Sequence, residues 1–562
     1  MFFLQEQRKS NFLKGAAILA ATGVFVKIVG AIYQIPILRV MGDEGAGYFH
    51  VTYMVYAFIL AISTAGVPVA LSRLISSSIA RSNYAMVRKY FSVAMPTFII
   101  VGTVAMLIMF FFADQIAELM NTSLASYGIR VLAPAVFFVC IISVLRGYAQ
   151  GFEDMVPTAI SQVIEVVSKA VIGIAVVFFL SGLGYEAQFV SAGAITGVTI
   201  GLGLCVPVMI WYKKRIERTH SDNSLVSQET SYQNQNSSVE SAELPTRKRT
   251  FLRIMKVSIP ISISATFMSI MGVVDTSIVS GRLQHALMLT ETEAVTQLGL
   301  LRKGLSIYNI PPSLIVPLAV SIIPAIASAI ARENKREVNL ITHSSLKLMN
   351  LFTMPACVGI SILAGPILRA LYYNPDQAPE AFASMTLILT ILGVAGYFVC
   401  FQHISISILQ ANGHERVSLI TFPIGAAVKI VLSYILVGNP NFGIIGSPIG
   451  TFACFATIVT LNLIFIKVRV KQKFNFVNSF LRPLLCTITM AAAAYFSYNL
   501  AYRFGSRYLG TSNMSIVLFL AFAVFIGVAV YCVMVVLTRT ISKEDLSHIP
   551  KGEKLAKLLR VR

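Results

Sequence analysis

Apolar runs long enough to cross a membrane recur along almost the whole of this chain, and no other sequence feature constrains its fold as strongly. A helix of about 20 apolar residues crosses the roughly 30 Å of bilayer hydrocarbon. Two clear examples are Phe91 to Phe112 and Ile516 to Leu537. Only 12% of the 562 residues are charged, about half of the share in an average soluble protein. The sequence therefore predicts an all-α polytopic membrane protein.

The apolar runs predict about fourteen transmembrane helices. The first run follows Arg8, Lys9 and Lys14 but is too long for a signal-peptide core, so we predict an uncleaved first span. The predicted spans cover residues 15–38, 49–79, 90–112, 131–150, 157–181, 190–212, 254–280, 305–331, 346–372, 382–411, 416–437, 444–466, 480–501 and 515–538.

Charges at the span ends predict the orientation. Basic clusters such as Lys213-Lys214-Arg215 and Arg247-Lys248-Arg249 fall on one side, and acids such as Asp43 and Glu44 on the other. The positive-inside rule then places both termini in the cytoplasm and the protein in the cytoplasmic membrane. The formal charge of +20 accordingly predicts attraction to anionic membrane lipids and not to nucleic acid.

Two echoes in the sequence indicate a duplicated architecture. Ser78-Ile79-Ala80-Arg81-Ser82-Asn83 is echoed by Ala329-Ile330-Ala331-Arg332-Glu333-Asn334. The second echo is a glutamine followed 19 residues later by a lysine, at Gln150 and Lys169 and again at Gln410 and Lys429. With six spans per half, both halves enter from the cytoplasm and form a parallel pseudo-twofold repeat, a transporter architecture with its site near the bilayer midplane.

A polar segment divides the chain into these halves. Thr219 to Thr246 is rich in Ser, Gln, Asn and Glu and contains no Lys or Arg, a composition that cannot bury enough apolar surface to fold. We predict a six-helix bundle at 1–218, a disordered cytoplasmic linker at 219–250, a second six-helix bundle at 251–473, and two additional helices with a basic cytoplasmic tail at 474–562.

Ionisable side chains inside predicted spans are the candidate functional residues, because each costs at least about 2.5 kcal/mol at bilayer depth and needs a partner or a water-filled cavity. Four are cations: Lys27, Arg73, Lys169 and Lys429. The acids Glu165 and Asp275 are too few to neutralise them, and are candidate counter-ions or coupling groups. Glu165 and Lys169, four residues apart, are predicted to pair.

A cationic cavity binds an anionic ligand such as a phosphate or carboxylate. Polar side chains at helical spacing accompany the charges, and they are predicted to line the cavity: Gln34 beside Lys27, and Gln162 beside Glu165.

Motifs for nucleotide binding and metal binding are absent from the sequence. There is no GxxxxGK[ST] loop, and the seven cysteines and seven histidines show no ligand spacing. The segments outside the spans are short apart from the linker. We therefore predict no cofactor, no metal, no catalytic residue and no enzymatic activity.

Several motifs resemble one transporter family. Arg146-Gly147-Tyr148-Ala149-Gln150-Gly151 followed by Pro157-Thr158-Ala159-Ile160-Ser161-Gln162-Val163-Ile164-Glu165 is similar to its RGYxQG and PTAxSQVxE signature. Gly42 to Gly47 and Ser63 to Pro68 resemble its GxEGxG and STxGxP turns. The family is the stage V sporulation protein B and polysaccharide biosynthesis branch of the multidrug/oligosaccharidyl-lipid/polysaccharide exporter superfamily, which includes the lipid II flippases.

The resemblance implies a fourteen-helix fold with two six-helix bundles around a central cationic cavity. In the lipid II flippases a basic residue lines the cavity in a pattern that Lys27-Ile28-Val29-Gly30 keeps. Tyr33 and Gln34, however, stand where those flippases tend to have a second Arg and an Asp.

These readings together predict a flippase for an undecaprenyl-diphosphate-linked cell-wall precursor, with lipid II as the best single substrate and cell-wall synthesis proteins as further partners. Alternatives are an exporter of another polyprenyl-linked polysaccharide unit and a multidrug/cation antiporter of the same superfamily. Two more distant alternatives are a polyprenyl-phosphate glycosyltransferase, which would need a large outward loop, and a scaffold, which would not need the buried cations.

Overall fold

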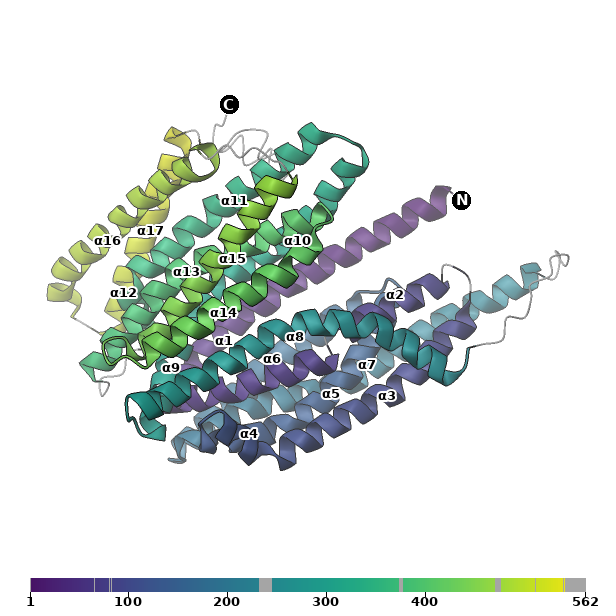
Figure 1. The fold of residues 1–562 in the computed structure, drawn as a ribbon, viewed down its shortest axis with the longest axis horizontal. Helices are drawn as coiled ribbons and strands as arrows, with labels where there is room; N and C mark the ends of the chain where they lie inside the picture. Colours follow the sequence, from purple (N-terminus) through teal and green to yellow (C-terminus); the bar gives the residue numbers. More distant parts are fainter. Residues whose placement is uncertain are drawn as a thin grey trace. The chain divides into compact units, whose positions relative to one another are not determined.

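The computed structural model describes residues 2–64, 66–79, 81, 83–231, 245–372, 378–470, 477–510, 512–538 and 540. Within these residues all regular structure is helical, which confirms the predicted all-α fold (Figure 1). The basic tail predicted after residue 540 and the centre of the predicted linker, residues 232–244, lie outside the described residues.

The helices follow the predicted spans closely. The long helices are α1 (Phe2–Thr64), α3 (Tyr84–Phe111), α5 (Ser126–Gly151), α6 (Val156–Gly182), α7 (Ala187–Ser231), α8 (Arg247–Ala286), α9 (Glu291–Tyr308), α10 (Ile310–Ala331), α11 (Lys335–Ile362), α13 (Pro379–Ala411), α14 (Ser418–Val437), α15 (Gly446–Phe465), α16 (Arg482–Leu509) and α17 (Asn513–Leu537). Three shorter helices complete the set: α2 (Val67–Ile79), α4 (Ala113–Leu119) and α12 (Ala364–Tyr372).

Eleven of the described helices are long and apolar enough to cross a membrane. α1 counts as one of them although it bends at Gly42 into two segments, and neither α8 nor the α9–α10 pair is among the eleven. Separating α1 at its bend and adding α8 and α9–α10 recovers the fourteen predicted spans.

The boundaries between spans differ from the prediction at two prolines. The second predicted span breaks before α2, where Pro68 occupies the first helical turn, and the eighth breaks at Asn309, where Pro311 and Pro312 follow. Proline lacks the N–H that continues a helix but is tolerated in a first turn. The turn that the resemblance implies at Gly42 to Gly47 is likewise shorter, because only Gly42, with φ 71°, leaves the helical conformation.

The chain forms two compact units, Met1–Ser280 and Gly281–Arg562. Most of α8 therefore groups with the first unit, whereas the sequence placed the seventh span in the second bundle. Two hydrogen bonds join the end of α8 to this unit: the Ser277 and Ser280 hydroxyls donate to the Leu119 and Asn121 carbonyls at 2.9 and 3.0 Å. α7 also continues as a helix to Ser231, inside the segment predicted as linker.

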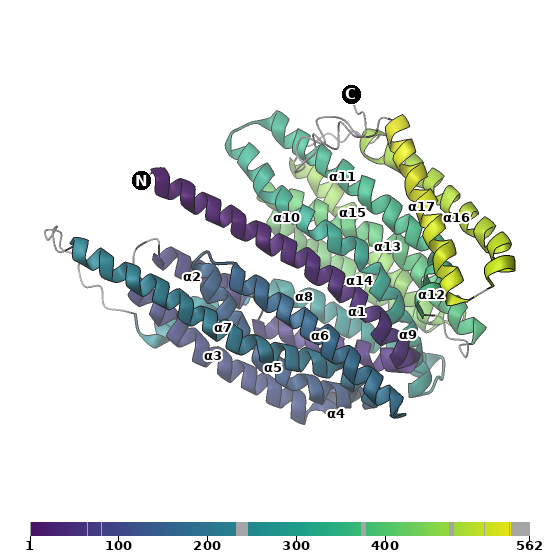
Figure 2. The same cartoon turned by 180° about the vertical axis from the view of Figure 1, so that it is seen from behind.

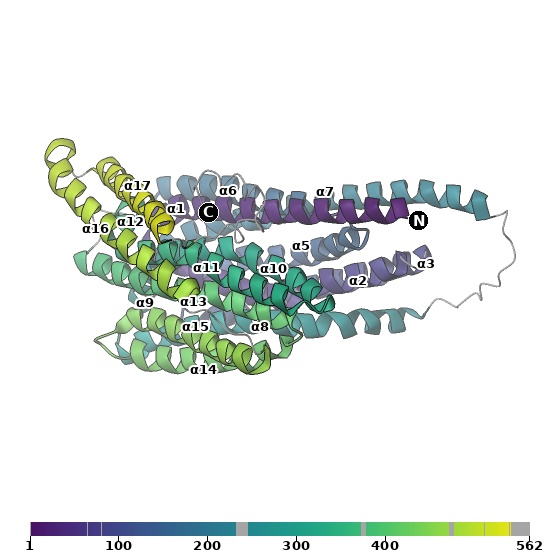
Figure 3. The same cartoon turned by 90° about the horizontal axis from the view of Figure 1, so that it is seen from above.

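The same helix packing occurs in both units (Figure 2). In the first unit α6 packs on α7, α5 on α7, α3 on α5 and α2 on α5. In the second unit α14 packs on α15, α13 on α15, α11 on α13 and α10 on α13. Helices α16 and α17 form a hairpin, in which α16 packs on α11 and α17 packs on α12 (Figure 3). The structure thus repeats one arrangement within each unit.

The sequence echoes mark equivalent turns of this repeat. Asn83 and Asn334, which end the first echo, are both N-caps: their side chains accept hydrogen bonds from the N–H groups of Met86 and Glu337. Such a cap stabilises a helix by about 1 kcal/mol. The echo therefore preserves the start of α3 and of α11.

The two glutamines of the second echo lie in equivalent turns at the ends of α5 and α13. The N–H groups of Glu153 and Gly413 donate to the Gln150 and Gln410 carbonyls, both at 3.0 Å. Both donors have positive φ, 62° at Glu153 and 75° at Gly413. Only the second unit has the glycine that this conformation favours.

We expect Glu153→Gly to stabilise the protein by about 1 kcal/mol, because a side chain in the left-handed region costs about 1–2 kcal/mol, part of which the entropy of glycine offsets. Gly413→Ala should destabilise it, since no atom crowds that position and only the backbone conformation is at stake. Unfolding in SDS followed by circular dichroism measures both, and destabilisation by Glu153→Gly would contradict the equivalence of the two turns.

Candidate functional site

The candidate site lies on α6, where polar side chains follow one face of an otherwise apolar helix. Thr158, Ser161, Glu165 and Lys169 are spaced by three and four residues, so they share a face. Pro157 sits in the first turn of α6, directly after the turn that reverses the chain from α5. The face therefore runs antiparallel to the end of α5.

The signature residues bind one another across α5 and α6. The Arg146 guanidinium donates from Nε to Ser161 Oγ at 2.8 Å and from Nη2 to Glu165 Oε2 at 3.2 Å. Gln150 Nε2 donates to Thr158 Oγ1 at 3.3 Å. The Arg146 and Glu165 side chains are 19% and 35% exposed, so this ion pair is partly shielded from solvent. The RGYxQG and PTAxSQVxE motifs thus join two neighbouring helices.

The predicted Glu165–Lys169 pair is wrong, because each residue has a different partner. Glu165 pairs with Arg146, and Lys169 Nζ instead donates to the Tyr53 hydroxyl of α1 at 3.0 Å. The ammonium also lies 4.7 Å from the centre of the Tyr53 ring and 4.9 Å from that of Tyr33, within the range of a cation–π interaction.

Lys169 consequently has an aromatic environment instead of a counter-ion. Within the part of the chain that the structure describes, no carboxylate oxygen lies within 4.0 Å of its ammonium. Phe49 stacks on Tyr53 with ring centres 5.7 Å apart and holds that ring in place. Tyr33 is only 3% exposed, whereas Lys169 is half-buried.

Sequence reasoning did not assign Arg146, Tyr33 or Tyr53 to the site. Folding the chain back at the turn between α5 and α6 would have placed Arg146 opposite Ser161 and Glu165. Nothing in the sequence pairs α1 with α6, so the two tyrosines had no comparable signal.

The other predicted residues fall into three environments. Lys27 on α1 and Arg73 on α2 are exposed, and Gln34 and Gln162 are half-buried. Asp275 on α8 is 7% exposed and adjoins Thr276, whose hydroxyl lies 3.5 Å from His50 Nε2. Lys429 is half-buried on α14 in the second unit. The structure joins none of these directly to Lys169.

Glycines allow a neighbouring helix to approach each lysine closely. A Cβ on Gly197 of α7 would lie 2.9 Å from the Lys169 carbonyl oxygen and 2.6 Å from Gly173 N. A Cβ on Gly450 of α15 would lie 3.2 Å from the Lys429 carbonyl oxygen. Close packing through glycine thus fixes the backbone of both lysines.

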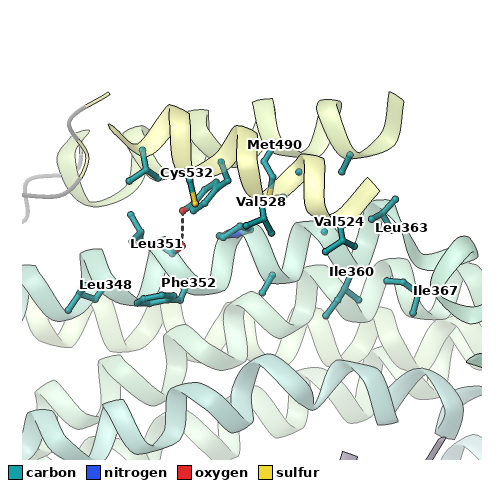
Figure 4. A pocket seen from close by; sticks show the side chains of 17 residues that line it. Leu348, Leu351, Phe352, Ile360, Leu363, Ile367, Met490, Val524, Val528 and Cys532 are labelled. Atoms are coloured by element: carbon teal, nitrogen blue, oxygen red, sulfur yellow. Dashed lines mark hydrogen bonds between the residues drawn. The ribbon is translucent and has the colours of Figure 1, made fainter. Parts of the chain in front are cut away.

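The second unit also contains an apolar pocket of about 660 Å³ between α11, α12, α16 and α17. Figure 4 shows its lining side chains, among them Phe352, Met490 and Val528. One wall is held by Tyr531, whose hydroxyl donates to the Leu351 carbonyl at 2.6 Å. A pocket with this lining suits a hydrocarbon chain and offers no polar chemistry.

Metal chemistry has no candidate centre in the described part of the chain, where no three His, Cys, Asp or Glu side chains lie close enough to hold an ion. Six of the seven cysteines are buried, and none forms a disulfide.

Comparison with known sequences identifies similar membrane proteins. A model of the family described as polysaccharide biosynthesis protein matches residues 12–330. Stage V sporulation protein B of Bacillus subtilis is 25% identical, with 96% of this chain and 98% of that protein covered. The lipid II flippase MurJ of the same organism is 26% identical, with 76% and 78% covered.

Solved structures of transporters share the fold. Lipid II flippase MurJ in an inward closed conformation superposes with a TM-score of 0.66 and 17% identity, covering 93% of this chain and 99% of that one. An inward-facing multidrug resistance transporter of the MATE family, described as a member of the MOP superfamily, gives a TM-score of 0.63 and 16% identity, covering 80% of this chain and 98% of that one.

We expect Gly197→Ala to lower the stability of the protein, because its Cβ would meet backbone atoms of α6 and displace the turn that carries Lys169. Gly203→Ala on the same helix is the matched control, since its Cβ would make ordinary contacts at 3.6 Å with Phe138. The midpoint of SDS-induced unfolding should fall clearly for the first variant only; equal midpoints would contradict close α6–α7 packing.

Proposed function

Since the chain belongs to the polysaccharide biosynthesis protein family, within the multidrug/oligosaccharidyl-lipid/polysaccharide exporter superfamily, we propose that it is a flippase for a polyprenyl-diphosphate-linked cell-wall precursor. It would move this precursor across the cytoplasmic membrane by alternating access. The family assignment supports a transporter of lipid-linked saccharides, and the nature of the site supports an anionic cargo.

The proposal rests mainly on the environment of the Lys169 ammonium, which contacts tyrosines and no carboxylate among the described residues. An ammonium at bilayer depth that is held by tyrosines, without a carboxylate, keeps its charge available. A diphosphate is a fitting ligand because its oxygens accept charge-assisted hydrogen bonds. Lys27, Arg73 and Lys429 would contribute further positive charge along the path, and Gln34 and Gln162 would contact the polar saccharide.

Glu165 and Asp275 are the acids within this charge set. Glu165 is engaged by Arg146, and Asp275 is buried on α8. We propose that these two acids act as counter-ions in the cationic path or couple transport to an ion, and that they do not bind the cargo. A cationic drug, the cargo of a multidrug antiporter, would need acids where this site presents a lysine, so the anionic substrate is favoured.

The membrane potential could drive the outward step. An inside-negative potential favours outward movement of an anion by about 2.3 kcal/mol per charge per 100 mV. This source of energy needs no nucleotide and suits a chain without a P-loop.

We also propose that both termini lie in the cytoplasm. Exposed cations near the end of the sixth predicted span on α7, such as Lys214 and Arg218, would contact anionic lipid headgroups there.

Lipid II is the substrate that we propose within this class, because a relative and a structural neighbour carry the name lipid II flippase. The family description, polysaccharide biosynthesis protein, favours a different polyprenyl-linked saccharide unit as the alternative. Cell-wall synthesis proteins would be partners in either case.

We expect the wild-type chain to rescue growth of a strain depleted of its lipid II flippase, and Lys169→Gln to lower that rescue at least tenfold at equal membrane abundance. The change removes the charge but keeps a polar side chain of similar length. Colony counts after depletion measure the effect.

Arg88→Gln, at an exposed cation on α3 that does not contact Lys169, is the control and should rescue like wild type. Rescue by Lys169→Gln would overturn the role of the lysine. A well-expressed wild type that does not rescue would redirect the proposal to the alternative saccharide carrier.

A further inference from the structure

We propose that Arg146 is a positioning residue that prevents Glu165 from neutralising Lys169. This inference rests on the proposed function in one respect, which is that an anionic group of the substrate meets the Lys169 ammonium. Arg146 belongs to the signature motif, but its own charge is paired with Glu165. Its role would therefore be to act on Lys169 through Glu165.

On α6 alone, an ion pair between Glu165 and Lys169 would be favourable. Glu165 precedes Lys169 by four residues, and side chains at this spacing are neighbours on a helix. A glutamate placed before a lysine at this distance is the favourable order for an ion pair. Left to itself, the helix would therefore pair these two residues and cancel the charge of the lysine.

The second step is that α5 removes the glutamate from this pair. Arg146 reaches Glu165 at 3.2 Å and is held in place by a second hydrogen bond, 2.8 Å long, to Ser161. Two hydrogen bonds hold the partly buried guanidinium against α6. It is therefore a better-placed partner for the Glu165 carboxylate than the flexible Lys169 side chain.

The third step is that α1 holds the lysine. Lys169 donates to the Tyr53 hydroxyl at 3.0 Å and lies against the Tyr53 and Tyr33 rings. These neighbours stabilise an ammonium without cancelling its charge. The three ionic side chains of this face thus sum to one positive charge, and the structure locates that charge on Lys169.

The second unit provides an internal comparison. Four residues before Lys429, in the place of Glu165, stands Gly425, and four residues before Gln410, in the place of Arg146, stands Ile406. The glutamate and the arginine are therefore absent together. The hydroxyl equivalent to that of Ser161, Thr421 Oγ1, is buried and has no hydrogen-bond partner among the described residues. α14 therefore lacks both the acid one turn before the lysine and the arginine that would engage such an acid.

The proposal predicts a specific pattern of binding of farnesyl diphosphate to the full chain in detergent, with farnesol as the uncharged control. Arg146→Gln should weaken binding about tenfold, equivalent to about 1.4 kcal/mol, because Glu165 then turns to Lys169. The double variant Arg146→Gln/Glu165→Gln should recover affinity close to that of wild type. Arg146→Gln should cause no further loss in a Lys169→Gln background.

Arg146→Lys keeps a cation for Glu165 and should retain most of the affinity, which covers the case in which Arg146→Gln does not fold. Two results would overturn the proposal: weak binding by the double variant, or equal losses from Arg146→Gln with and without Lys169. Either would give Arg146 a direct or purely structural role.

A second measurement separates this inference from the proposed function. Acylation of Lys169 by a soluble N-hydroxysuccinimide ester, quantified by peptide mass spectrometry, needs no substrate. It should be slower in Arg146→Gln than in wild type and recover in the double variant. If wild type does not bind farnesyl diphosphate but acylation shows this pattern, the proposed substrate class fails and the role of Arg146 stands. Unchanged acylation would overturn the role of Arg146.

Discussion

A charged lysine within a membrane-spanning helix is the constraint on which the rest of the first unit depends. Such a charge is expensive in hydrocarbon, and its neighbours decide whether it survives as a charge. Here α1 provides aromatic rings and a hydroxyl, α5 engages the nearby acid, and α7 packs on the backbone through glycine. Three helices thus maintain one ammonium: α5 and α7, which flank α6 in the chain, and α1, whose Tyr53 lies 116 residues before Lys169.

Most of the fold was predictable because apolar length and charge asymmetry are local properties. Runs such as Ile516 to Leu537 need only their own residues to specify a span. The errors occurred where backbone chemistry acts over a few residues, as at Pro311 and Gly42. The grouping of α8 was not predictable, since it involves contacts between distant parts of the chain, such as the hydrogen bonds from Ser277 and Ser280 to a turn more than 150 residues earlier.

The candidate site was predictable in its residue types but not in its pairing. Lys169 and Glu165 stand out as charges within apolar sequence, and their spacing by itself favours an ion pair between them. Arg146 becomes a visible partner of Glu165 only when the chain is folded back at the turn between α5 and α6, and Tyr53 comes from a helix whose proximity only the tertiary structure establishes. Spacing within one helix is therefore a poor guide to ion pairs wherever a neighbouring helix offers a better-anchored partner.

The bend of α1 at Gly42 has a mechanical consequence. Tyr33 lies before the bend and Tyr53 after it, yet both contact the same ammonium. Any change in the angle between these two arms is a rotation about the φ and ψ of one glycine, because both flanking segments are helical. Lys169 therefore connects the two segments of α1 across Gly42. A change in the bend at Gly42 would move the two tyrosines relative to each other and so shift the position of the Lys169 ammonium.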